Sequence, residues 1–91
     1  MRADREVVVE IAGLESPTIC DLAPATLAAI WASIRFLPMP GSQHQLLERY
    51  FEGPCAERNV INHLAANPFL AIPVGECEVR IRWANPDLQQ A

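Results

Sequence analysis

Charged and apolar residues alternate throughout the segment 76–83, Glu-Cys-Glu-Val-Arg-Ile-Arg-Trp, if Cys77 is counted as a small apolar residue. Because successive side chains of a β-strand point to opposite faces, this pattern predicts a strand with one face in a core and the other in water. The core face would be formed by Cys77, Val79, Ile81 and Trp83. The opposite face would carry a charged strip, formed by Glu76, Glu78, Arg80 and Arg82. A chain with such a strand needs a sheet that is covered on one side only.

Three further segments are candidates for strands of the same sheet. Residues 69–74 precede Gly75 and predict the other half of a C-terminal hairpin, in which Pro73 favours an edge position. Residues 6–11 are β-branched and alternate loosely, which predicts an N-terminal strand. Residues 18–22 are ambiguous: they fit a second strand of an N-terminal hairpin, or a helical turn capped by Ser16. The strand is the preferred interpretation.

Neighbouring first and last strands would bring opposite charges together. In that arrangement Arg80 and Arg82 would meet Glu6 and Glu10 across the uncovered face of the sheet.

Helical periodicity fills the middle of the chain. Apolar residues recur at helical spacing over 24–37, where Pro24 fits the first turn and Pro38 ends the helix. A second helix is expected to start at a capping box formed by Ser42 and Gln45. Its buried face would consist of Leu46, Leu47, Tyr50 and Phe51, with Gly53 as a left-handed residue after its end. A third helix is predicted over 54–66, with Val60, Ile61 and Leu64 inward.

These elements predict one domain that spans residues 1–91, with frayed tails at 1–5 and 86–91. A chain of 91 residues, 51% of them hydrophobic, has enough apolar surface for one modest core. Three helices cannot cover both faces of so small a sheet. We therefore expect an α+β fold: a two-layer sandwich in which a small, mainly antiparallel sheet carries about three helices on one face.

Charge and composition favour a cytoplasmic protein. No apolar run approaches the roughly 20 residues that span a membrane, and no apolar stretch follows the charged N-terminus as in a signal peptide. All seven basic residues are arginine and the chain is rich in alanine, which suggests a bacterial or phage genome of high GC content. The net charge is −4 and the arginines are dispersed, so direct binding to nucleic acid is not expected. Three scattered cysteines, an odd number, argue for reduced thiols.

No residue pattern predicts a cofactor or a metal. His44 and Glu48 are four residues apart on one predicted helix, and Cys55 and His63 lie on the next, but this spacing lacks the tight pairs typical of zinc sites. Cys55 near a helix start is the candidate nucleophile, with a histidine as base and Glu57 as orienting acid. Solvated or packed side chains explain all of these residues more simply.

The connector 36–42, Phe-Leu-Pro-Met-Pro-Gly-Ser, combines large apolar residues with two prolines and no charge. It is either a rigid joint whose side chains fold onto the core, or a preordered contact surface. Its candidate partner-binding residues are Phe36, Leu37 and Met39, and the charged strip supplies Glu76, Glu78, Arg80 and Arg82.

We therefore expect a small, non-enzymatic protein-binding module without a cofactor, which occupies a surface of a larger protein or of its own copy. A finer hypothesis, by class analogy only, is a phage or mobile-element inhibitor of a bacterial host machine, of the kind that anti-CRISPR proteins represent. The alternatives are a thiol-dependent enzyme centred on Cys55 and a structural homo-oligomer.

Overall fold

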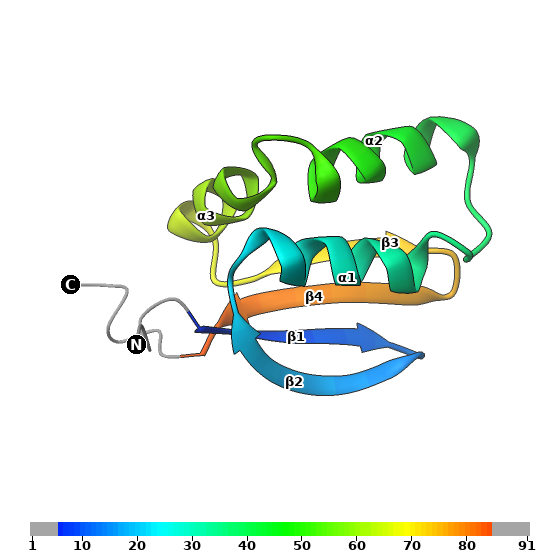
Figure 1. Cartoon of the computed structure of the whole chain (residues 1–91). Coiled ribbons are helices and arrows are strands. Elements are labelled where there is room, and N and C mark those ends of the chain that lie inside the picture. Colours follow the sequence, from blue (N-terminus) through cyan, green and yellow to red (C-terminus); the bar gives the residue numbers. More distant parts are fainter. Residues whose placement is uncertain (1–5, 85–91) are drawn as a thin grey trace.

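Two strands, three helices and two further strands follow one another along the chain (Figure 1). The computed structural model describes residues 6–84, so the expectation of frayed tails lies outside the described residues. The elements are β1 (Glu6–Ala12), β2 (Glu15–Asp21), α1 (Pro24–Ile34), α2 (Gly41–Glu52), α3 (Ala56–Ala66), β3 (Leu70–Val74) and β4 (Cys77–Trp83).

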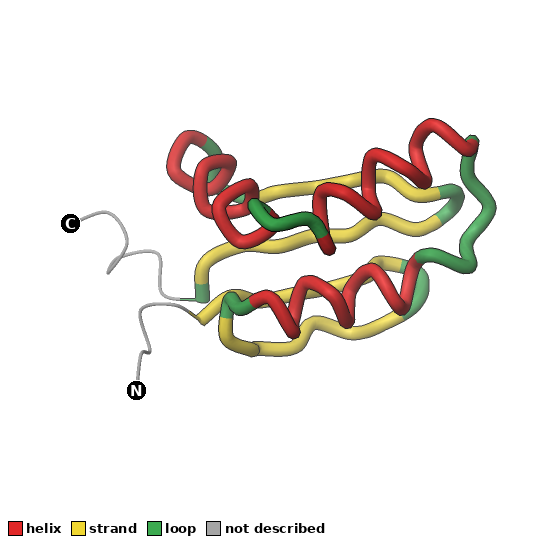
Figure 2. The backbone as a smooth tube through the Cα atoms, turned by 45° about the horizontal axis from the view of Figure 1, so that its top comes forward, coloured by secondary structure: helices red, strands yellow, loops and turns green. Residues whose placement is uncertain are grey.

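The four strands form one antiparallel sheet in the order β2-β1-β4-β3, in which two hairpins meet at the central pair β1 and β4. The ambiguous segment 18–22 is extended: its residues up to Asp21 belong to β2, where Ile19 pairs with Val8. All three helices lie on the same side of the sheet. In Figure 2, α1 lies in front of the β1–β2 hairpin, and α2 and α3 lie in front of the β3–β4 hairpin. The predicted two-layer α+β sandwich is confirmed.

The core fills the space between the two layers. Alternate residues of the central strands, Val7 and Ile11 of β1 and Val79 and Ile81 of β4, are at most 1% exposed. The largest fully buried side chains are Trp31 of α1 and Phe51 of α2, which complete the core from the helical side. The sheet is therefore buried on its helical side, and the alternation of β4 leaves its charged side chains on the other.

The helix boundaries differ from the sequence prediction. α1 ends at Ile34 rather than at Leu37, whose amide instead donates to the Ile34 carbonyl at 3.0 Å in a turn. Pro38 disfavours helical backbone at Leu37 and has no amide hydrogen with which to extend the helix. α3 begins at Ala56 rather than at residue 54.

The predicted start and buried face of the second helix are partly wrong. α2 begins at Gly41 after an extended Pro40, and no side chain caps its first turn, so the capping box at Ser42 does not form. Leu46 was expected to be buried, but it is 63% exposed. Since the helix buries Leu47 and Phe51, four residues apart, Leu46 is rotated by about 100° from that stripe.

Gly53 was expected in the left-handed region, but its φ is −74°. The glycine is required for space rather than for backbone freedom. A Cβ atom at this position would collide with the carbonyl oxygen of Arg49, one turn earlier in α2. The amide of Gly53 also donates to this oxygen at 2.9 Å, so the two groups cannot separate without loss of the bond that closes the helix.

Gly53→Ala is therefore expected to lower the free energy of unfolding by about 1–3 kcal/mol, the usual cost of overpacking. Gly41→Ala is the matched control. A Cβ atom there meets nothing within 4 Å, and alanine is the better helix former, so we expect no loss of stability. Urea unfolding followed by circular dichroism measures both variants, and equal stability of the two would contradict the steric argument.

Candidate interaction face

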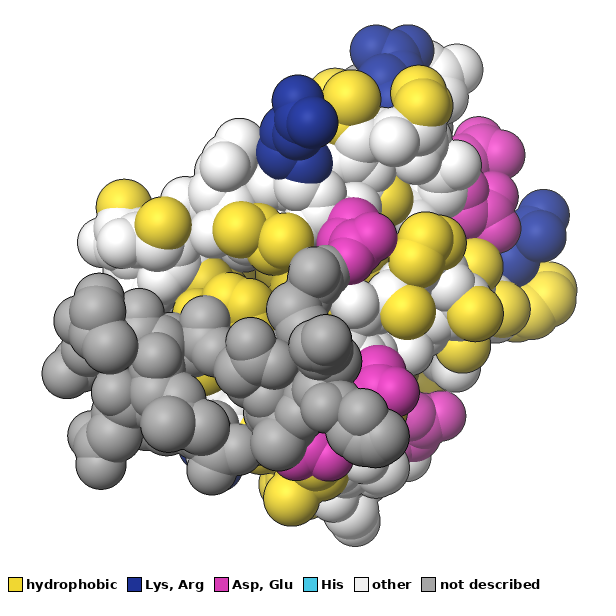
Figure 3. Space-filling model, turned by 60° about the vertical axis from the view of Figure 1, so that its left-hand side comes forward, with side chains coloured by type: hydrophobic (Ala, Val, Ile, Leu, Met, Phe, Trp, Pro, Cys, Tyr) yellow, Lys and Arg dark blue, Asp and Glu magenta, His cyan; other side chains and the backbone are white. Residues whose placement is uncertain are grey.

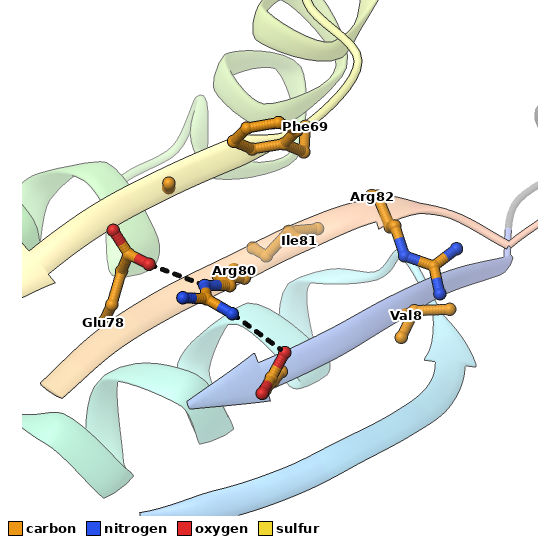
Figure 4. Close-up of a pocket in the computed structure, with 8 residues that line it drawn as sticks. Val8, Phe69, Glu78, Arg80, Ile81 and Arg82 are labelled. Atoms are coloured by element: carbon orange, nitrogen blue, oxygen red, sulfur yellow. Dashed lines mark hydrogen bonds and ion pairs between the residues drawn. The ribbon is translucent and has the colours of Figure 1, made fainter. Parts of the chain in front are cut away.

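The side of the sheet opposite the helices, here called the open face, is the candidate functional surface. Figure 4 looks onto this face, with the helices behind the strands. Strand register determines which side chains stand side by side on it. Val8 pairs with Ile19 on one side and with Arg82 on the other. Leu70 pairs with Ile81, so the preceding Phe69 lies next to Arg82 in the same direction.

Four residues form a row across the sheet, here called the apolar row because three of them are apolar: Ile19, Val8, Arg82 and Phe69, the last directly before β3. Ile19 is 62% exposed and Phe69 is 54% exposed. Single exposed apolar residues are common on protein surfaces, but two of them at the ends of one row are a stronger signal. Figure 3 shows exposed hydrophobic side chains at the end where β1 begins, dispersed among charged ones.

The neighbouring row on the open face is charged. Glu10 of β1 pairs with Arg80 of β4, and Arg80 pairs with Ala71 of β3. Arg80 donates from Nε to Glu78 Oε1 at 2.6 Å, and its Nη1 lies 3.7 Å from Glu10 Oε1. The hydrogen bond to Glu78 and the two nearby carboxylates raise the pKa of Arg80 above its ordinary value. This row is therefore internally paired.

Arg82 differs from Arg80 in its surroundings. Its guanidinium lies above Val8 in Figure 4, and no carboxylate of residues 6–84 forms an ion pair with it. Arg82, Phe69 and Val8 line a shallow hollow of about 450 Å³ together with residues of the charged row. The hollow thus combines apolar walls with one cation that is unpaired within the described chain.

The edges of the sheet are less suited to contacts than its face. Both edge strands contain a proline, Pro17 in β2 and Pro73 in β3, and proline has no amide hydrogen to donate to an added strand. Prolines on edge strands are a common means by which proteins prevent edge-to-edge pairing. Each edge strand therefore has one amide donor fewer for an added strand than a strand without proline.

The structure brings together most of the charged strip. Glu78, Arg80 and Arg82 lie on the open face, as predicted. Glu76 does not belong to it, because it lies with Gly75 in the tight turn between β3 and β4. Gly75 has a φ of +61°, which matches the requirement of two-residue hairpin turns and takes Glu76 out of the strand.

The predicted contacts between charges are correct for one arginine only. Arg80 meets Glu10, but Arg82 lies opposite Val8 rather than a glutamate. Sequence reasoning missed Val8, Ile19 and Phe69. Val8 could have been found from the sequence, because it alternates with the buried Val7 and Val9 and so points to the opposite face. Ile19 and Phe69 could be placed beside it only after the strand register was known.

The connector between α1 and α2 divides into two parts. Phe36 is 83% exposed, and the guanidinium carbon of Arg35 lies 5.8 Å from the centre of its ring. Leu37 and Met39 are half-buried and pack against the core. The three residues therefore do not form one exposed surface, and they belong to the helical layer rather than to the open face.

The residues considered for catalysis or metal binding converge only in part: Cys55 and Glu57 line one hollow, but neither histidine does. Cys55 is exposed before α3, in a hollow of about 510 Å³ that no histidine lines. The ring of His44 packs edge-on against Trp31, with centroids 4.8 Å apart. His63 Nε2 lies 3.2 Å from the carbonyl oxygen of Phe69. Among residues 6–84, no group of three or more His, Cys, Asp and Glu side chains is arranged to hold a metal ion.

The other two cysteines serve packing. Cys20 and Cys77 are half-buried against the core, and all three cysteines are free thiols. Burial, with a smaller contribution from the neighbouring Asp21, raises the pKa of the Cys20 thiol, which reduces its reactivity at neutral pH.

None of the helices in the described part of the chain is long and apolar enough to cross a membrane. Comparison of the sequence with models of protein families and with curated proteins, and of the fold with solved structures, gave no match.

Proposed function

We propose that this chain is a small, non-catalytic protein-binding module, and that the open face is its contact surface. The observation that supports this proposal most directly is the apolar row, in which Ile19 and Phe69 remain more than half exposed at opposite edges of the sheet, on the side that residues 6–84 leave uncovered. Covering each of these side chains would contribute about 1.5–3 kcal/mol relative to leaving it in water.

The composition of the open face fits the centre of a protein interface. Aromatic residues and arginine are enriched there, and they carry much of the binding energy. Phe69 supplies the aromatic ring, and Arg82 supplies a guanidinium that a partner carboxylate can reach. The paired charges of Glu10, Glu78 and Arg80 would orient a partner, since their arrangement is already set within the sheet.

Chemistry at Cys55 has less support, because the hollow beside it lacks a histidine that could act as a base. The net charge of −4 favours a basic partner surface through long-range attraction. It is therefore compatible with the finer hypothesis of an inhibitor that covers the nucleic-acid-binding surface of a bacterial machine.

The proposal is tested by pull-down of the tagged protein from a bacterial lysate, read by mass spectrometry. Ile19→Asp places a charge on the open face and should remove a specific partner, with a loss of affinity of about thirtyfold or more, as for a central interface residue. Leu46→Asp is the matched control, because Leu46 is equally exposed (63%) but lies on α2. Phe36→Ser tests the connector separately.

The proposal would be overturned by a stoichiometric partner that Ile19→Asp still binds and that Leu46→Asp or Phe36→Ser loses. All variants must first show the circular dichroism spectrum of the unmodified protein, since only a folded variant reports on the contact.

A further inference from the structure

We infer that the open face recognises a second copy of this chain, and that two copies pair face to face about a twofold axis parallel to the strands, between β1 and β4. This inference rests on the proposed function and identifies the partner of the same surface. It follows from the order β2-β1-β4-β3, in which such an axis exchanges the two central strands with each other and the two edge strands with each other.

The arrangement keeps the strands of the two copies aligned. Rotation about an axis parallel to the strands preserves their direction and leaves each cross-strand row opposite the same row of the second copy. Stacking of two sheets whose mean strand directions lie within about 30° of each other is a standard packing of β-sandwiches. The proposed dimer therefore needs only the kind of sheet-to-sheet contact that β-sandwich proteins already use.

The ends of the apolar row are complementary under this axis. Ile19 of β2 faces Phe69 of the second copy, which directly precedes β3, and the symmetry repeats this contact at the other side of the interface. The two most exposed apolar side chains of the open face thereby cover each other.

The charges are complementary as well. Glu10 of β1 faces Arg80 of the second copy on β4, and this contact also occurs twice. Arg82 faces Val8 of the second copy. Glu6 and Glu10 point to the same face two residues on either side of Val8. The guanidinium of Arg82, which has no ion pair within residues 6–84, therefore enters between two carboxylates.

A twofold axis directly over either central strand places like charges together. An axis directly over β1 brings Glu10 onto its own symmetry mate, and an axis over β4 does the same for Arg80 and for Arg82. Like charges in contact across an interface disfavour that arrangement strongly. The charges of the central strands thus favour the axis between β1 and β4 over an axis on either of these strands.

The size of the open face predicts a weak dimer. Strands of five to seven residues at about 3.4 Å each, spaced about 4.8 Å apart, make a face of roughly 20 by 22 Å. The area buried by two such faces, about 440 Å² per copy, is below that of standard interfaces and in the range where transient complexes are found. Two copies that each carry a net charge of −4 also repel each other at long range, which weakens the pair further. We expect a dissociation constant in the micromolar range or weaker.

A charge-reversal mixing experiment tests the pairing. Glu10→Arg alone and Arg80→Glu alone should each raise the dissociation constant of self-association about tenfold or more, because both symmetry-related contacts become repulsive. An equimolar mixture of the two variants should associate again. In the mixed dimer the introduced arginine of one variant faces the introduced glutamate of the other, and the unchanged Arg80 faces the unchanged Glu10. Sedimentation equilibrium over micromolar to millimolar concentrations measures each case, with circular dichroism as the check of folding.

A second pair of variants covers the case in which a charge reversal perturbs the sheet. Ile19→Asp should abolish association, and Leu46→Asp should leave it unchanged, although both positions are equally exposed. A native chain that stays monomeric up to millimolar concentration overturns the inference. A dimer that tolerates Ile19→Asp, or charge-reversed variants that do not associate on mixing, also overturn it.

These outcomes are separate from failure of the proposed function. A monomeric chain that captures another protein through Ile19 overturns only the second copy as partner. A chain that binds neither itself nor another protein through the open face overturns both.

Discussion

Phe51→Ala is expected to lower the free energy of unfolding by about 3–5 kcal/mol, as for other large aromatic residues removed from a core. Phe51 is 1% exposed and contacts the ring of Tyr50 edge-on, with centroids 5.3 Å apart. It belongs to α2, which packs chiefly on the other two helices. Its removal leaves a cavity between the helical layer and the sheet that the surrounding side chains fill only in part.

The effect is large for a domain of this size, since small domains are stable by about 5–15 kcal/mol. Leu46→Ala on the same helix is the control, because Leu46 is 63% exposed and its truncation should change stability by no more than about 0.5 kcal/mol. Urea unfolding of both variants, compared with the native chain, measures the difference. A cost below about 1.5 kcal/mol for Phe51→Ala, half the lower limit for such a truncation, would mean that α2 contributes little to the core.

The sheet could be predicted because its sequence signals are local. The alternation around Val79 and Ile81 requires one buried and one solvated face, and the structure has both. The helical layer followed from apolar spacing in the same way, as Leu27, Ile30 and Ile34 show. A two-layer sandwich was then the arrangement of three helices and a small sheet that covers all of the apolar stripes.

The helix ends could not be predicted, because several local signals compete there. Ser42 has the spacing of a capping box, but Pro40 already has an extended backbone that starts the helix earlier. Gly53 has the position of a left-handed glycine, but the close approach of the Arg49 carbonyl is the constraint that it satisfies. In both cases the residue type was informative and the assigned reason was wrong.

The apolar row is a property of register, which no single strand encodes. Val8, Ile19 and Phe69 come from three separate segments, and only the strand pairing shows that they stand in line with Arg82. The charged strip was visible in advance because three of its members, Glu78, Arg80 and Arg82, belong to one strand. Sites assembled across strands therefore need the structure, while sites along one strand do not.

Trp31→Ala is expected to be comparably destabilising, by about 3–5 kcal/mol, because the indole is 1% exposed and is the largest fully buried side chain. It packs edge-on against the ring of His44, which joins α1 to α2. Thermal or urea unfolding measures the loss. Fluorescence of the remaining Trp83 reports on the sheet independently of the mutated site.

Trp31→Phe separates the contribution of the packed aromatic ring from that of the buried indole N–H group. The indole Nε1 is buried and finds no hydrogen-bond acceptor among residues 6–84. An unsatisfied buried donor costs about 1–3 kcal/mol. Its removal therefore offsets much of the stability that is lost because phenylalanine is smaller than tryptophan. We therefore expect Trp31→Phe to lie within about 1 kcal/mol of the native chain. A loss close to that of Trp31→Ala would show that the N–H is satisfied in solution, for instance by a bound water, and that the core at α1 is more polar than its side chains indicate.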